Sequence, residues 1–253
     1  MKKLSIFVCL LCLFVTAPAL GDFYGGRVNY NRINGYYSGN GGEFTLSSDG
    51  GLGLLLDLSA YSSLTKNQIG PTGLASFQTF CVETGEYVAQ PMDIVVSTTS
   101  AEGISNSHAI LGGEAVGDDL DPRTAYFYTQ FATGNLSGYA YSGTVDGLNR
   151  AETAGALQRL IWWIEEEGGL LAANNTFQNI TLSFDQADLI QAWLYEYTSS
   201  GWTGIGDVRI LNTYNTTNGD RAQDQLYLVP VPGAVLLGIL GLGAAGLKLR
   251  RFA

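Results

Sequence analysis

The chain has 253 residues, of which 46% are hydrophobic and only 14% charged, and its 23 Asp and Glu outnumber its 13 Lys and Arg, which gives a formal net charge of −10 at pH 7. Such an acidic chain is a poor partner for nucleic acid or for an anionic membrane surface. The 33 glycines and 14 tyrosines are instead typical of a turn-rich extracellular β protein.

Residues 1–21 have the pattern of a secretory signal peptide. Two lysines precede an uncharged apolar run over residues 4–15, and small residues follow, so cleavage is expected after Ala19 or Gly21. A lipoprotein signal or an uncleaved anchor fits less well, because neither cysteine of the segment follows a small residue and the apolar run is short for a membrane span. Removal of this segment would leave Cys81 as the single cysteine.

The remaining body, residues 22–228, is long enough for one domain with its own core. It keeps eight Lys and Arg against all 23 acidic residues, a net charge of about −15. Its first part carries strand signals, short apolar runs separated by Gly, Asn, Asp or Pro, at residues 43–46, 52–58, 76–83 and 92–99. In the third run, alternation places Phe77 and Cys81 on one face and Phe80 on the other, with Cys81 near the end of the strand.

The next segment is polar and loop-like, and its strongest strand signal is at residues 125–131. It also holds an acidic cluster, for which we favour a solvated loop over a calcium site, because the spacing matches no complete calcium-binding motif. His108, the only histidine, is either a solvated loop residue or a base that assists acyl transfer. The acidic cluster consists of Asp118, Asp119 and Asp121.

Two helices are predicted after this segment, near residues 150–167 and 184–198. Each begins with a capping box, and the first ends at a Gly-Gly pair. Both have an apolar stripe at helical spacing. The capping pairs are Asn149 with Glu152 and Ser183 with Gln186, and the stripes are Leu157, Leu160, Ile161 and Ile164 in the first helix and Ile190, Trp193, Leu194 and Tyr197 in the second.

A predicted hairpin closes the body, with strands at residues 207–211 and 225–229 and a turn at Asn218-Gly219. These elements together predict an α+β fold: a β-rich sandwich or barrel-like body with an inserted helical part.

Residues 229–253 have the pattern of a transmembrane helix with a basic tail. The uncharged stretch 229–247 would cover about 28 Å as a helix, close to the hydrocarbon thickness of a bilayer. The basic residues that follow place the tail in the cytoplasm and the body outside. The two ends of the chain therefore agree on export.

This tail resembles the PEP-CTERM sorting signal, which an exosortase-type processing enzyme recognises. The resemblance covers about the last 25 residues, and it departs from the usual Pro-Glu-Pro at Val231. It implies a stay in the inner membrane during sorting, then the cell surface or the extracellular matrix; an ordinary single-pass anchor is the alternative. The residues that carry it are Val229, Pro230, Val231, Pro232, Gly233, Lys248, Arg250 and Arg251.

Two short motifs in the body carry a second resemblance. Phe80-Cys81-Val82-Glu83 ends a predicted strand, and 77 positions after Cys81 a predicted helix contains Gln158-Arg159-Leu160-Ile161-Trp162. This pair resembles the motifs of bacterial thioester-domain adhesins, an aromatic-Cys motif and a Gln-x-x-Ile/Val-Trp motif. Leu160 departs from the family, which often has a small residue there.

The resemblance implies a thioester between Cys81 Sγ and Gln158 Cδ, shielded from water by Phe80, Trp162 and Trp163. An amine or a hydroxyl of an unknown surface or matrix partner would attack this acyl group, so the protein would be a single-use covalent binder without a cofactor and not an enzyme.

The alternative is a structural or matrix surface protein with the same sorting signal and no thioester. Cys81 is then an inert buried thiol packed with Phe77, Gln158 a surface residue, and Trp162 and Trp163 core residues. A serine or zinc hydrolase has little support, because the chain has one histidine, no Gly-x-Ser-x-Gly motif and no His or Cys cluster. Paired carboxylates for glycoside cleavage stay open, and so does the role of residues 165–167, three glutamates at a helix end.

Overall fold

The computed structural model describes residues 23–49, 56–67, 75–84, 87–88, 90–97, 119–168 and 171–230. The predicted signal peptide at residues 1–21 lies outside these ranges, as do His108 and Asp118. Of the predicted sorting signal, only Val229 and Pro230 lie inside them. Within the part of the chain that the structure describes, no helix is long and apolar enough to cross a membrane.

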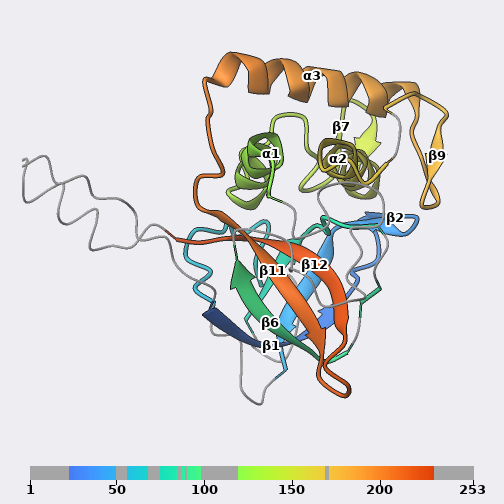
Figure 1. Ribbon diagram of the computed structural model, residues 1–253. Helices are drawn as coiled ribbons and strands as arrows, with labels where there is room; N and C mark the ends of the chain where they lie inside the picture. Colours follow the sequence, from blue (N-terminus) through green and yellow to red (C-terminus); the bar gives the residue numbers. More distant parts are fainter. Residues whose placement is uncertain are drawn as a thin grey trace, which may run out of the picture.

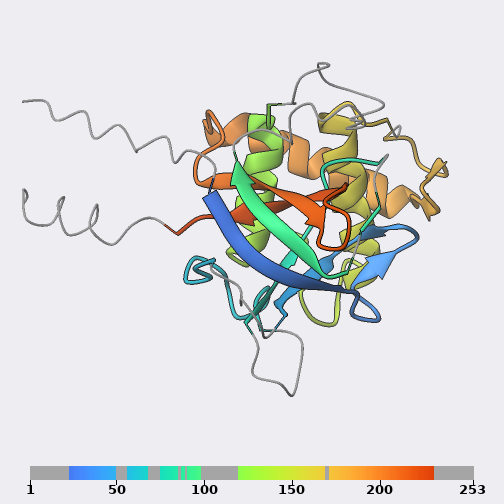
Figure 2. The same cartoon turned by 60° about the horizontal axis from the view of Figure 1, so that its bottom comes forward.

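The body is an α+β fold built on one strongly curved antiparallel sheet, with helices on one side of it (Figure 1). Figure 2 shows the sheet in front of the helices. The spatial order of its strands is β12-β11-β6-β1-β4-β5. In chain order these strands are β1 (Phe23–Asn31), β4 (Phe44–Ser48), β5 (Ser76–Thr79), β6 (Met92–Ser97), β11 (Val208–Asn215) and β12 (Arg221–Leu228).

The two outer strands of the sheet approach each other just beyond the end of β5. The amide of Leu226 donates to the carbonyl of Phe80 at 3.1 Å, and the amide of Val82 donates to the carbonyl of Asp224 at 3.2 Å. Between them, Cys81 forms an isolated antiparallel bridge with Gln225 of β12. The curved sheet, which forms a half-barrel, is therefore held together along a short seam between residues 80–82 and residues 224–226. Cys81 lies in the middle of this seam.

Within the described residues, three two-stranded hairpins accompany the sheet. They are β2 (Tyr37–Ser38) with β3 (Gly41–Gly42), β7 (Thr144–Val145) with β8 (Leu148–Asn149), and β9 (Thr176–Phe177) with β10 (Ile180–Thr181).

The predicted strands agree with the sheet in most places. The runs at 43–46, 76–83 and 92–99 contain β4, β5 and β6, and the final hairpin is β11 and β12, joined by the predicted turn. The run at 52–58 is different: residues 56–58 form no strand, and 52–55 lie outside the described residues. The sequence reading also missed β1, because two glycines interrupt its alternation at a register shift between Tyr24 and Gly26.

The prediction of a strand at residues 125–131 is wrong, because these residues belong to the helix α1 (Pro122–Ala132). Asp121 is the N-cap and accepts from the amide of Arg123 at 2.7 Å, while Pro122 takes the first helical position, where its missing N–H costs nothing. The aromatic composition favours a strand locally. Here the N-cap and the burial of Phe127 and Phe131 stabilise a helix instead of a strand.

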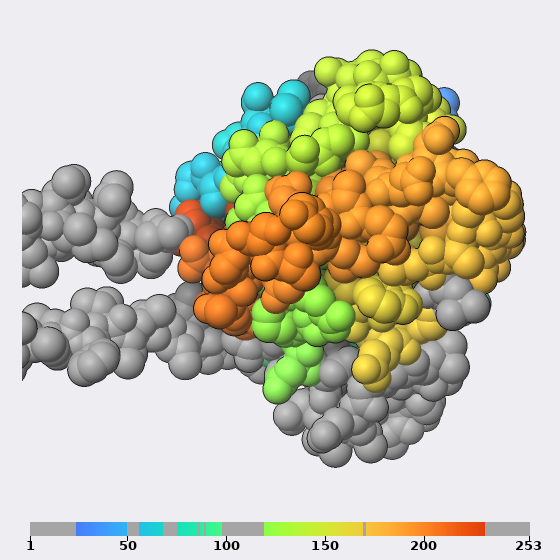
Figure 3. Space-filling model, turned by 90° about the horizontal axis from the view of Figure 1, so that it is seen from above, coloured from blue at the N-terminus to red at the C-terminus, as the bar shows by residue number. Residues whose placement is uncertain are grey.

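The other two helices are confirmed, as are their capping boxes. Helix α2 (Arg150–Ile164) ends three residues earlier than expected, and α3 (Phe184–Ser200) ends at Gly201, whose φ of 70° suits a left-handed cap. Helices α1 and α2 lie next to the sheet and α3 lies across them on the outside (Figures 1 and 3). Helix α2 is accordingly buried on nearly every side, while α3 buries only Gln186, Ile190 and Trp193.

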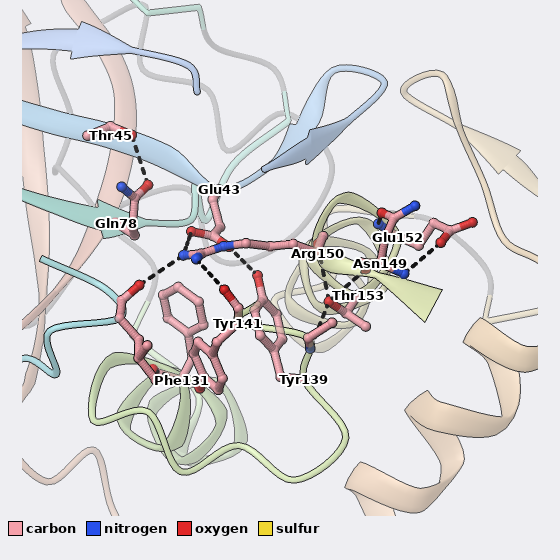
Figure 4. Close-up of polar contacts among 12 residues, drawn as sticks. Glu43, Thr45, Gln78, Phe131, Tyr139, Tyr141, Asn149, Arg150, Glu152 and Thr153 are labelled. Carbon is pink, nitrogen blue, oxygen red and sulfur yellow. Dashed lines mark hydrogen bonds and ion pairs between the residues drawn. The ribbon is translucent and has the colours of Figure 1, made fainter. Parts of the chain in front are cut away.

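A buried ion pair fixes the start of α2 against the sheet (Figure 4). Arg150 donates to both carboxylate oxygens of Glu43, at 2.6 and 2.8 Å, and Tyr139 donates to the same carboxylate at 2.6 Å. Burial raises the pKa of Glu43, and the guanidinium and the phenol oppose that rise. Because Glu43 directly follows β3, this network sets where α2 lies relative to Gly41 and Gly42.

Candidate functional site

Cys81 occupies the seam between the β5 end and β12, and no part of it is exposed to solvent. Its backbone is held by the bridge to Gln225, so the position of its side chain is set by the closing of the sheet. The short strand β5 ends at Thr79, two residues earlier, and Thr79 fixes that end by donating from its hydroxyl to the carbonyl of Leu226 at 2.6 Å.

Gln158 approaches Cys81 from α2 and is also completely buried. The thiol of Cys81 donates to Gln158 Oε1 at 3.3 Å, and Gln158 Nε2 donates to the carbonyl of Cys81 at 2.8 Å. The two residues that the motif resemblance pairs therefore lie in contact, although 77 positions separate them.

The surroundings of the sulfur keep it protonated. Burial raises the pKa of the Cys81 thiol well above its ordinary value, and the negative charges of Glu83 and Glu167 add to the rise. The indole of Trp162 works in the opposite direction and is close enough to the sulfur to lower this pKa, although its N–H makes no hydrogen bond of good geometry. Reaction at this sulfur therefore requires the thiol proton to move to a neighbouring group.

The three residues expected to shield the bond are placed differently from one another. Trp162 is 1% exposed and packs edge-on against Phe177, with ring centroids 5.7 Å apart. Phe80 is buried, but it packs on Phe131 of α1 at 4.9 Å. Trp163 is 37% exposed. Of the three, Trp162 is the one that influences the pKa of the Cys81 thiol.

Gly41 of β3 lies directly against the glutamine. A Cβ added to it would lie 2.6 Å from Gln158 Cγ and 2.8 Å from Trp162 Cη2. Real Cβ contacts are longer than this, so a side chain at position 41 would displace both residues. The β2–β3 hairpin thus forms one wall of the site.

The glutamates at the end of α2, left open by the sequence, divide into different roles. Glu167 is buried and accepts from the amide of Thr84 at 3.1 Å and from its hydroxyl at 3.2 Å. It therefore fastens the segment after Cys81 to the end of α2. Glu166 is exposed and has a positive φ of 60°.

A pocket of about 210 Å³, here called the Trp162 pocket, adjoins the site. Aromatic rings of Tyr30, Phe44, Tyr87 and Trp162 line it. Tyr30 lies close enough to Cys81 for the sulfur to influence the pKa of the phenol, which burial raises. Cys81 and Gln158 themselves are buried, and Trp162 both lines the pocket and interacts with Cys81.

The other sequence candidates that the structure describes do not lie at this site. Asp121 is used as the cap of α1 and as the partner of Arg123 at 2.7 Å. Among the described residues, no group of three or more His, Cys, Asp or Glu is placed to hold a metal ion. The sorting-signal residues from Val231 onward lie outside the described ranges.

Sequence reasoning missed Gly41 and most of the Trp162 pocket. The run Ser38-Gly39-Asn40-Gly41-Gly42 signals a turn, and nothing local indicates that this turn touches a helix more than a hundred residues later.

Comparison with protein-family models, with curated proteins and with solved structures finds no match for this chain.

Proposed function

We propose that this protein is an exported surface protein that attaches covalently to a partner through a thioester between Cys81 and Gln158. The observation that supports the proposal is the pair of hydrogen bonds between the two side chains in a fully buried site. A buried cysteine can pack against any apolar neighbour. Here it lies against the one side chain whose carbonyl carbon it would have to attack.

The step balances without a further reactant. The sulfur bonds to Gln158 Cδ, the Cδ–Nε2 bond breaks, and the thiol proton leaves with the amide nitrogen as ammonia. The thiol already donates to Oε1, which polarises the carbonyl, and the Cys81 carbonyl holds the departing nitrogen. Because both residues are sealed from solvent, water has no direct access to the bond that would form.

The finished bond would also brace the fold. It would close a loop of 77 residues between the sheet seam and α2. Chain entropy assigns such a closure up to about 4.5 kcal/mol of stability. A partner's amine or hydroxyl would then take the acyl group of Gln158 and release Cys81 as a thiol, once per molecule.

Export and sorting belong to the same proposal. They rest on the signal-peptide pattern of residues 1–21 and on the proline pair, apolar stretch and basic tail of residues 229–253. An exosortase-type enzyme would process this tail, and the body would reach the cell surface or the extracellular matrix.

The second candidate, a structural surface protein with an unbonded thiol, is favoured by one observation. The raised pKa of Cys81 disfavours the thiolate that attacks most readily. The two candidates differ in one covalent bond, so mass spectrometry separates them.

The test uses the full chain, expressed with its own terminal segments, and its Cys81→Ala variant. A thioester makes the wild-type body lighter by one ammonia, and methylamine then opens it, leaving N-methylglutamine at position 158 and an alkylatable Cys81. The variant shows neither change. A wild-type protein of full mass, unaltered by methylamine, would leave the structural candidate.

A further inference from the structure

We propose that the Trp162 pocket holds a sugar ring of a polysaccharide and that a hydroxyl of this sugar is the nucleophile that opens the thioester. This inference rests on the proposed function and names the chemical class of its partner. It is carried by the lining of the pocket, by its charge and by its position beside the buried pair.

The aromatic part of the lining suits the faces of a sugar ring. The rings of Tyr30 and Phe44 lie 5.2 Å apart at 41°, and Tyr87 is 88% exposed. Phe44 and Trp162 also line the pocket but are only 2% and 1% exposed, so Tyr87 offers a ligand the most open ring. The C–H faces of a hexopyranose are apolar, and aromatic side chains with a polar end cover such faces well. An exposed tyrosine beside an open pocket is available to a ligand without unfolding anything.

The polar part of the lining suits the hydroxyls. Asn40, Gln178 and Gln223 bring side-chain amides, each of which carries both a donor and an acceptor. Asn40 donates to Gln178 Oε1 at 3.4 Å, and Gln178 donates to the carbonyl of Thr84 at 3.4 Å. Both contacts are at the long end of hydrogen bonding, so a sugar hydroxyl replaces them at little cost.

Charge in the pocket disfavours a lysine partner. Among the described residues that line it, Arg32 is the one charged residue, and it is held in place by donating to the carbonyls of Gly39 and Gly41, both at 3.0 Å. An ammonium group would therefore meet a fixed guanidinium. Glu83 and Glu167 lie near the sulfur but do not line the pocket, so neither carboxylate would bind an ammonium group within it.

The pocket is next to the bond that must be broken. Trp162 belongs both to its wall and to the immediate surroundings of Cys81. A hydroxyl held in the pocket attacks Gln158 Cδ once the ring of Trp162 has moved aside. The Cδ–S bond breaks, the hydroxyl proton passes to Cys81 Sγ, and an ester joins the sugar to the former glutamine.

The first experiment measures reversible binding to the full chain carrying Cys81→Ala, which cannot form the thioester. Dextran and alginate oligosaccharides serve as neutral and uronate probes and are titrated by calorimetry. Saturable binding of either probe is expected. Adding Tyr87→Ala should weaken it about tenfold, the effect of about 1.4 kcal/mol of lost contact. Tyr195→Ala is the matched control, because Tyr195 is 76% exposed on α3, outside the pocket lining, and should change nothing.

The second experiment offers the wild-type protein the bound oligosaccharide and Nα-acetyl-lysine together. An ester-linked sugar on the peptide that contains Gln158 is expected to dominate, and Tyr87→Ala should shift the products toward lysine. Methylamine reactivity without binding of either sugar by the Cys81→Ala chain would overturn this inference alone. So would a dominant lysine adduct that Tyr87→Ala leaves unchanged, which would point to a protein partner. Absence of any methylamine adduct would overturn the thioester itself.

Discussion

Cys81 and Gln158 exchange two hydrogen bonds, one from the thiol to Oε1 at 3.3 Å and one from Nε2 to the cysteine carbonyl at 2.8 Å. The two bonds join the seam of the half-barrel to the middle of α2. A substitution that moves either the seam or α2 should therefore change the geometry of this pair. Single substitutions at several positions can be used to test this.

Gly41→Ala should prevent the thioester although neither Cys81 nor Gln158 is replaced. The new Cβ would lie 2.6 Å from Gln158 Cγ and 2.7 Å from Ile180 Cδ1, so the glutamine must shift. Overpacking of this kind costs about 1–3 kcal/mol, measured by urea unfolding. Mass spectrometry should find the full amide mass.

Gly155→Ala is the matched control for that change. Gly155 lies one turn before Gln158 on α2, and the atoms nearest to its added Cβ would belong to Ser38, at 3.0 and 3.5 Å, and to Ile180, at 3.4 Å. The thioester should still form. If both variants form it equally well, close packing at Gly41 does not position Gln158.

Trp162→Phe should make the thioester short-lived, whereas Trp163→Phe should not. Trp162 is buried beside the sulfur, and the smaller ring lets water approach, whereas Trp163 is partly exposed. We expect hydrolysis to be faster by about tenfold, which corresponds to about 1.4 kcal/mol. The measurement is the loss of the cross-linked peptide with time at neutral pH. Equal lifetimes in the two variants would remove Trp162 from its shielding role.

Arg150→Met should destabilise the fold strongly, because it leaves Glu43 as a buried carboxylate without its cation. Such a loss costs about 3–5 kcal/mol in the free energy of unfolding. Adding Glu43→Gln to this variant should recover part of the loss. The half-exposed pair of Arg27 and Asp93 is the comparison, and Asp93→Asn should have a far smaller effect. Additive losses in the double variant would mean that the pair is not coupled.

The stability of a chain without the thioester should fall as pH rises above about 8.5, the pKa of an unfolded cysteine. Gln158→Met provides such a chain. Burial raises the pKa of Cys81, so the folded form keeps a proton that the unfolded form loses, and stability present below that pH is lost above it. The expected slope is about 1.4 kcal/mol per pH unit up to about pH 10, where tyrosines begin to titrate.

The reference for this slope is the double variant Gln158→Met with Cys81→Ala, whose stability should stay level over the same range. Iodoacetamide should label Cys81 slowly in the folded single variant and rapidly after urea is added. Rapid labelling of the folded chain would contradict the burial of the thiol.

Local patterns in the sequence were enough for much of the fold. Helices α2 and α3 begin where their capping boxes predict, because a cap is formed by residues three positions apart and needs nothing from the rest of the chain. The β11–β12 hairpin follows from its turn for the same reason. Helix α1 could not be predicted in this way, because its aromatic composition favours a strand. The local signal for a helix, Asp121 before Pro122, is only two residues long.

The sequence by itself also determined that Cys81 and Gln158 are candidate partners, through the motifs around them. Only the tertiary structure decided that they touch, because their meeting depends on the bridge from Cys81 to Gln225 and on the Glu43–Arg150 pair that places α2. The wall at Gly41 and the lining of the Trp162 pocket come from distant parts of the chain. Contacts between distant segments leave no periodic trace in a single sequence, so a pocket of this kind becomes visible only when the sheet has curved and the helices have packed against it.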